Sequence, residues 1–113
     1  MSEAHARLAV YRRSRAVCEV CGNRPGQSWH HRKNRSQGGR WTPANGLHVC
    51  GDGTTGCHGW IGANPAESYK NGWLVRSTFD PAAIPVRYRG RLVLLDDDGG
   101  VTDVEGPEDD DHW

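Results

Sequence analysis

The chain has 113 residues, of which 35% are hydrophobic and 15 are glycine, and its mean hydropathy is −0.76. This length suits one domain, and so polar a small domain usually needs a metal ion or disulfide bonds to complete its core. No apolar run approaches the roughly 18 residues of a membrane span, and residues 1–11 lack the pattern of a signal peptide. We therefore predict a cytoplasmic protein without a membrane partner, in which cysteines bind metal rather than each other.

The net charge of zero hides an asymmetry along the sequence. Residues 1–50 contain nine Lys and Arg and two acidic residues, whereas residues 51–113 contain five Lys and Arg and twelve acidic residues. The basic half predicts a polyanionic partner, although a solvated basic surface has the same composition. We expect residues 106–113 to form an acidic disordered tail. One hypothesis is that residues 105–111 screen the basic surface until a nucleic acid displaces them.

Up to residue 76, short predicted elements alternate with glycine-rich loops. The N-terminal segment 1–17 contains a predicted helix from Ser2 to Arg15, with Leu8 and Tyr11 on one face. The other elements, predicted from hydrophobic pattern and from turn and capping residues, are strands over 27–32 and 47–50, a polar loop over 34–45, and helices over 57–63 and 65–71.

The pattern changes after residue 72. Short strands are predicted there, separated by turns that contain glycine and aspartate, over residues 73–76, 86–88, 91–95 and 101–104. We therefore expect an α+β fold in which a core over residues 18–76 is followed by a strand extension over residues 77–105.

Four cysteines form a predicted metal site. Cys18 and Cys21 have the spacing of a zinc knuckle, whose two thiolates reach one tetrahedral ion. Cys50 and Cys57 are separated by six residues, and the glycines between them would let this loop fold back on the metal. Four thiolates leave no open coordination position for a substrate, so we predict a structural Zn²⁺ rather than a catalytic one.

A second group of polar residues lies between and beside the cysteines. His30 and His31 fall on the first predicted strand, Asn45 precedes the second, and His58 directly follows Cys57 at the start of a helix. Neighbouring residues on a regular strand face opposite ways, so one of the two adjacent histidines could serve only packing or the surface. Asn45 could instead be only a turn residue before Gly46.

Three segments carry these residues: WHHR at 29–32, NGLHVC at 45–50 and GCHGWI at 56–61. They resemble the HNH endonucleases, and most closely the small HNH proteins of bacteriophages and actinobacteria. The resemblance covers about residues 15–76 and implies a zinc-stapled ββα-metal core in a bacterial or phage-infected host cell. It also implies hydrolysis of DNA phosphodiester bonds, by nicking or cleaving, to 5′-phosphate and 3′-hydroxyl products.

The resemblance also implies the role of each residue in the site. His31 would be the general base, His30 and His58 the ligands of a catalytic divalent ion, and Asn45 a brace for the loop between the strands. The implied catalytic ion is Mg²⁺ or Mn²⁺, with Ni²⁺ or Zn²⁺ as alternatives. These residue types fit the reaction, because it needs a proton acceptor for the attacking water and positive charge on the phosphate.

One position departs from the family pattern. Many members carry a further histidine one helical turn after the position of His58, where this chain has Gly62. Two protein ligands would suit a weakly held Mg²⁺ or Mn²⁺, with Asn64 or Asp52 as candidates for a third oxygen. The opposite interpretation is a degenerate, inactive site.

The loop after the histidine pair is basic, and we predict that it binds DNA phosphates without reading bases. Its predicted DNA-binding residues are Arg32, Lys33, Arg35 and Arg40. In phages the resemblance implies the large terminase subunit as a partner in genome packaging, whereas a toxin-like or defence nuclease would use the same chemistry. The alternative function is a non-catalytic zinc-stapled module that binds nucleic acid or an assembly partner and does not need His31.

Overall fold

The computed structural model describes residues 2–104 and shows a small α+β fold. Its helices are α1 (Glu3–Ser14), α2 (Gly56–Ala63) and α3 (Pro65–Lys70), with 3₁₀ turns η1 (Arg35–Gln37), η2 (Pro43–Asn45) and η3 (Pro81–Ala83). Its strands are β1 (Ser28–His31), β2 (Gly46–Val49), β3 (Val86–Tyr88), β4 (Arg91–Leu95) and β5 (Val101–Asp103). The predicted tail over residues 106–113 lies outside the described residues.

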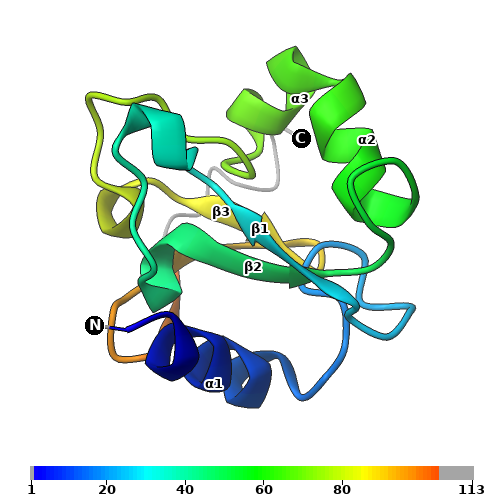
Figure 1. Ribbon diagram of the computed structural model, residues 1–113, viewed down its shortest axis with the longest axis horizontal. Helices are drawn as coiled ribbons and strands as arrows, with labels where there is room; N and C mark the ends of the chain where they lie inside the picture. The colour runs from blue at the N-terminus through cyan, green and yellow to red at the C-terminus, as the bar shows by residue number, and fades with distance from the viewer. Residues whose placement is uncertain (1, 105–113) are drawn as a thin grey trace.

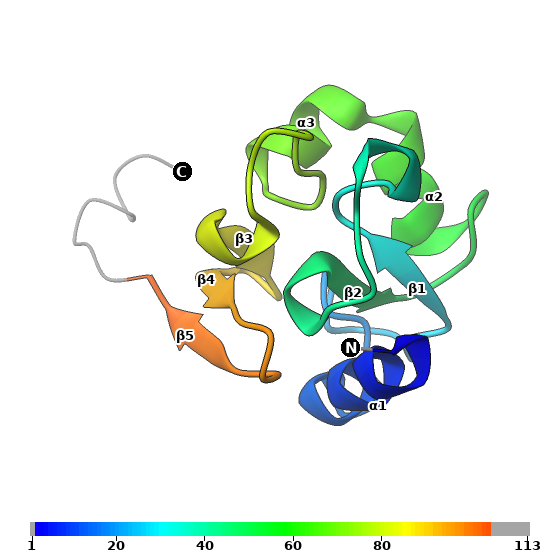
Figure 2. The same cartoon turned by 60° about the vertical axis from the view of Figure 1, so that its left-hand side comes forward.

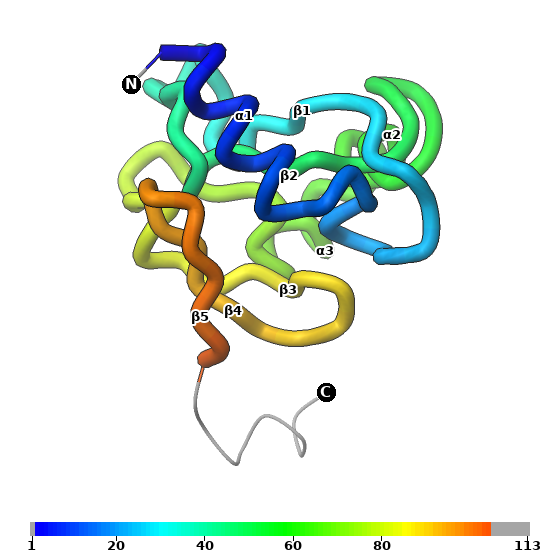
Figure 3. The backbone as a smooth tube through the Cα atoms, turned by 90° about the horizontal axis from the view of Figure 1, so that it is seen from below, coloured from blue at the N-terminus to red at the C-terminus, as the bar shows by residue number. Residues whose placement is uncertain are grey.

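The strands β1 and β2 form an antiparallel pair with a helix layer on each face. Figure 1 shows α1 on one side of the pair and α2 with α3 on the other, and in Figure 3 α1 lies in front of β2, the strand that it contacts. The register is regular from Ser28 opposite Val49 to His31 opposite Gly46. Because a regular strand alternates its side chains, the predicted site is divided between the two faces.

The second sheet has the order β3-β4-β5 and lies beside the β1–β2 pair (Figure 2). The two sheets share one apolar cluster, in which Leu47 and Val49 of β2 pack with Val86, Val93 and Leu95. The predicted strand extension is therefore part of the core. The prediction of a further strand over residues 73–76 is wrong, because this segment bonds to residues of α3 and to Arg32 instead of a strand.

Helix α1 begins where the sequence predicts, because the Ser2 hydroxyl accepts a hydrogen bond from the His5 amide. The face that it buries is narrow and small, formed by Ala6, Val10 and Ser14. Leu8 and Tyr11, which share a face in the sequence pattern, remain 46% and 55% exposed. None of the helices in the described part of the chain has the length and apolar character to span a bilayer.

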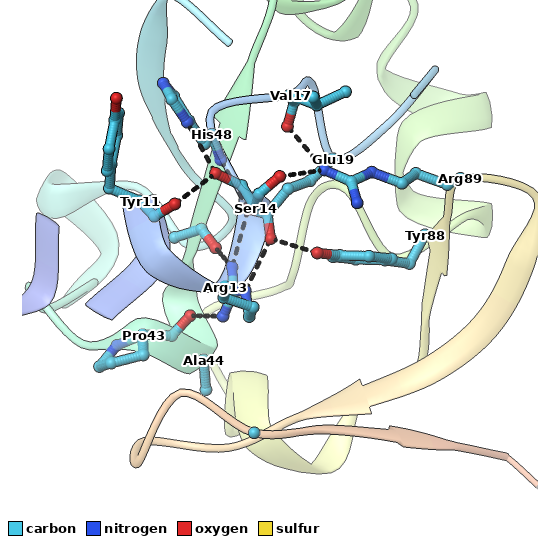
Figure 4. A network of polar contacts seen from close by, with 12 residues as sticks. Tyr11, Arg13, Ser14, Val17, Glu19, Pro43, Ala44, His48, Tyr88 and Arg89 are labelled. Carbon is cyan, nitrogen blue, oxygen red and sulfur yellow. Dashed lines mark hydrogen bonds and ion pairs between the residues drawn. The ribbon is translucent and has the colours of Figure 1, made fainter. Parts of the chain in front are cut away.

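A buried ion pair connects α1 to the first cysteine turn (Figure 4). Arg13 donates two hydrogen bonds of 2.7 and 2.9 Å to the carboxylate of Glu19, and both side chains are almost completely buried. The hydroxyl of Tyr88 donates to the same carboxylate at 2.7 Å, and the amide of His48 donates at 2.8 Å. Since the buried charge has a full set of partners, Glu19 ties α1, β2 and β3 to the turn between Cys18 and Cys21.

Candidate metal centres

The four cysteines come together as the sequence predicts. The Sγ atoms of Cys18, Cys21, Cys50 and Cys57 all lie within 4.8 Å of one another, and none forms a disulfide bond. Tetrahedral zinc with bonds of about 2.3 Å holds its sulfur ligands about 3.8 Å apart, so a small contraction of this cluster suffices to bind the ion. The cluster therefore fits a structural metal such as zinc.

Backbone amides lie close to sulfur atoms of this cluster, although burial raises the pKa of the Cys50 and Cys57 thiols. The amide of Cys57 lies 3.3 Å from Sγ of Cys50, and that of Asn23 lies 3.5 Å from Sγ of Cys21. At Cys18, burial raises the pKa, but backbone hydrogen bonds outweigh this effect and lower the pKa to about 7. Amides that point at sulfur stabilise the charged form that binds metal.

The second candidate centre is the pair of His30 and His58 on the α2 face of β1. Their rings are 5.4 Å apart between centroids and nearly perpendicular, with an interplanar angle of 69°. Both line an open groove of ≈ 380 Å³ beside α2 and α3. The distance between the rings places two imidazoles within reach of one ion.

Hydrogen bonds fix the tautomer of each ring in this pair. Nε2 of His30 must donate its proton to the carbonyl oxygen of Trp73, 2.6 Å away, because a carbonyl only accepts. The hydroxyl of Ser28 donates its single proton to the Gly51 carbonyl at 2.8 Å, so it accepts a proton from Nδ1 of His58, also at 2.8 Å. The lone pairs are therefore on Nδ1 of His30 and Nε2 of His58. Metal-binding histidines usually have such partners on the second ring nitrogen.

Both imidazoles are held neutral, which is the form that binds metal. Burial lowers the pKa of His30 to about 4, outweighing the hydrogen bond to Trp73 that acts in the opposite direction. Burial also lowers the pKa of His58, against the attraction of the Asp52 charge. Neither ring therefore needs to lose a proton near pH 7 before it can bind an ion.

The groove is open at the position where the family pattern has a third histidine. A Cβ atom built on Gly62 would meet nothing within 4 Å. Neither Asp52 nor Asn64, the predicted sources of a third oxygen, lines the groove. Oδ1 of Asp52 accepts hydrogen bonds from Thr54 and Thr55, and the Asn64 amide donates to the Trp60 carbonyl.

Asn45 lies where it can brace the loop that follows β1. Its side-chain oxygen accepts a hydrogen bond of 2.7 Å from the Lys33 amide, and its side-chain nitrogen donates to the carbonyls of Lys33 and Arg40. Asn45 is itself almost completely buried. A side chain that closes both ends of a loop does more than occupy a turn.

His31 lies on the face of β1 opposite to the His30–His58 pair. Its ring contacts Trp41 at 4.5 Å between centroids, and it does not line the groove of the pair. The indole of Trp29 donates to Nδ1 of His31 at 3.0 Å, which leaves the proton of the neutral ring on Nε2. That nitrogen is buried without a partner among the described residues. A general base at Nε2 needs the other tautomer.

The basic loop divides into exposed and buried residues. Arg35 and Arg40 are exposed, and Lys33 is partly exposed. Arg32 is completely buried, and its guanidinium donates to four backbone carbonyls at 2.7–3.0 Å. Arg32 is therefore unavailable to DNA phosphates, and its prediction as a DNA-binding residue is corrected to a structural role.

Sequence reasoning missed three groups around the candidate centre. These are the hydroxyl of Ser28, the carbonyl of Trp73 and the residue Asn34, which lines the groove of the histidine pair. The alternation along β1 gives a signal for Ser28, because it lies two residues before His30 on the same face. No sequence pattern indicates a backbone carbonyl more than 40 residues away.

In comparisons with known proteins, no family model, curated protein or solved structure matches the chain.

Proposed function

We propose that the protein is a metal-dependent endonuclease of the HNH type, which hydrolyses DNA phosphodiester bonds at the His30–His58 pair. The observation that carries this proposal is the fixed pair of tautomers, which presents two neutral imidazoles to one open groove. When bound there, a divalent ion such as Mg²⁺ or Mn²⁺ supplies positive charge for the phosphate and the leaving oxygen. The cysteine cluster, with four thiolates, serves as scaffold.

The division of the histidines between two faces of β1 suits in-line displacement. The attacking and leaving oxygens of a phosphoryl group lie on opposite sides of phosphorus. A phosphate at the edge of β1 that does not pair with β2 would have His30 and His58 on one side and His31 on the other. For His31 to accept the proton of water at Nε2, its bond from Trp29 must break, its proton must move to Nδ1, and the buried Nε2 must become accessible to water. His31 as general base therefore stays a prediction.

The basic loop supports substrate binding in this proposal. Lys33, Arg35 and Arg40 lie on the segment that Asn45 braces, and their cationic groups would hold phosphates beside the scissile bond. Such contacts carry no base readout. Roles in phage genome packaging with the large terminase subunit, or in defence, are proposed from the resemblance alone, and the neighbouring genes would separate them.

Plasmid nicking by the zinc-loaded protein tests the proposal. Nicking should appear with added Mg²⁺, Mn²⁺, Ni²⁺ or Zn²⁺, disappear in His58→Ala, and remain in His5→Ala, which removes an exposed histidine of α1. Loss of nicking in His31→Ala with unchanged metal affinity would support its role as base. If wild type and His58→Ala bind DNA equally and neither cuts with any metal, the protein is instead a non-catalytic zinc-stapled binding module.

A further inference from the structure

An aromatic cluster lies on the α1 face of β1, away from the candidate catalytic groove. It consists of Trp29, His31 and Trp41, and we call it the aromatic cluster. The two indole rings are 5.0 Å apart between centroids, and His31 lies 4.5 Å from Trp41 and 5.7 Å from Trp29. All three residues are only partly buried, so this concentration of rings is not explained by the core alone.

Two arginines lie over the rings of this cluster. The guanidinium carbon of Arg7 is 4.9 Å from the Trp41 centroid and 5.9 Å from that of Trp29, and Arg35 is 6.0 Å from Trp41. Arg7 also pairs with Glu3 at 2.8 Å, but both side chains of this pair are 51% exposed. Exposed pairs of this kind are weak, so a phosphate can take the place of Glu3 at little cost.

An open groove of ≈ 460 Å³ continues from the cluster along α1. Its lining includes Trp29 and Arg7 together with Leu8, Tyr11 and His48. Leu8 and Tyr11 are among the large hydrophobic side chains that remain most exposed. The groove therefore combines accessible aromatic surface with the cationic group of Arg7.

We infer that the aromatic cluster and this groove bind the bases of an unpaired nucleic-acid strand, while Arg7 and Arg35 hold its phosphates. Proteins that bind single strands combine stacking side chains with a positive groove. A duplex keeps its bases stacked inside and offers no free base face to Trp41 or Tyr11. The guanidinium groups of Arg7 and Arg35 over the rings favour this occupant over an apolar peptide.

The position of the cluster relates this binding to cleavage. Trp29 and His31 alternate along β1 with Ser28 and His30. A nucleic-acid strand that passes the edge of β1 not paired with β2 would therefore contact both faces. A phosphate could lie at the histidine pair while a neighbouring base stacks on Trp41. This link to the substrate of cleavage rests on the proposed function, whereas base binding itself does not.

Fluorescence anisotropy without added divalent ions tests base binding separately from cleavage. The zinc-loaded protein is titrated with three labelled oligonucleotides of equal length: a single strand, its blunt duplex, and a single strand with consecutive abasic positions. We expect the single strand to bind at least about fivefold more tightly than the abasic strand, the lower limit for loss of one base–aromatic stack. Trp41→Ala should lose this preference, and Trp60→Ala, which removes an exposed tryptophan of α2, should keep it.

The comparison of oligonucleotides uses wild-type protein, so it holds even where Trp41→Ala folds poorly. Equal affinity for the normal and abasic strands, or a preference for the duplex, would overturn the inference and indicate another occupant of the groove. The inference would also be overturned if Trp41→Ala and Trp60→Ala changed the preference for the normal over the abasic strand by the same amount. A protein that shows the expected base preference but cuts no DNA with any metal would retain this inference and refute the endonuclease.

Discussion

Ser28→Ala should weaken the candidate catalytic metal site without altering its two ligands. The Ser28 hydroxyl lies 2.8 Å from Nδ1 of His58 and 2.8 Å from the Gly51 carbonyl, and it is the only hydrogen-bond acceptor that the described residues give to that ring nitrogen. A methyl group cannot accept the proton, so the ring loses its fixed tautomer and its orientation. Removing such a partner typically costs 10–100-fold in metal affinity, or about 1.4–2.7 kcal/mol.

Isothermal titration of the zinc-loaded protein with Mn²⁺ measures this loss directly. Ser36→Ala, which removes an exposed hydroxyl in η1, is the matched control and should bind Mn²⁺ as wild type does. Nicking by Ser28→Ala should recover at saturating Mn²⁺, because both ligand rings remain. Unchanged Mn²⁺ affinity in Ser28→Ala would refute the argument that this hydroxyl sets the tautomer of His58.

Three further predictions follow from the same geometry. Gly62→His should raise Mn²⁺ affinity at least about tenfold in the same titration, since a Cβ there has open space and position 62 shares a helix face with His58, four residues earlier. Unchanged affinity would mean that the new imidazole does not reach the ion. Arg32→Met should lower the free energy of unfolding, measured in urea, by at least about 4 kcal/mol, because it removes four hydrogen bonds from a charged donor. If the variant is as stable as wild type but binds DNA more weakly, the original prediction that Arg32 contacts DNA is correct. Burial lowers the pKa of His30 to about 4, so near pH 5 the unfolded chain binds a proton that the folded protein excludes. The contribution of His30 to the free energy of unfolding is therefore fully present above about pH 6.5 and is lost as the pH falls toward 4. Relative to His30→Gln, unfolding of the wild type without added divalent ions should become about 2 kcal/mol easier between about pH 7 and pH 5, and parallel curves would contradict this burial effect.

Local sequence signals predicted most elements and the ligands of the cysteine cluster. The spacing of Cys18 and Cys21 is typical of two thiolates that bind one ion, and the turn residues between strands act only on their neighbours in the sequence. The strands β1 and β2 were predicted within a residue of their observed bounds for the same reason. At residues 73–76 an apolar run resembled a strand, but tertiary contacts gave its backbone other partners.

What the sequence by itself determined is therefore which chemical groups are present and which cysteines form the candidate metal site. Only the tertiary structure decided which face of β1 each histidine occupies, because this depends on a strand register without a bulge up to His31. It also decided that Arg32 is buried, since its four carbonyl partners come from distant parts of the chain, and that Trp29 and Trp41 meet beneath Arg7. The residue types of a basic loop do not distinguish an arginine that donates hydrogen bonds to backbone carbonyls from one that binds phosphate, because the difference lies in contacts far apart in sequence.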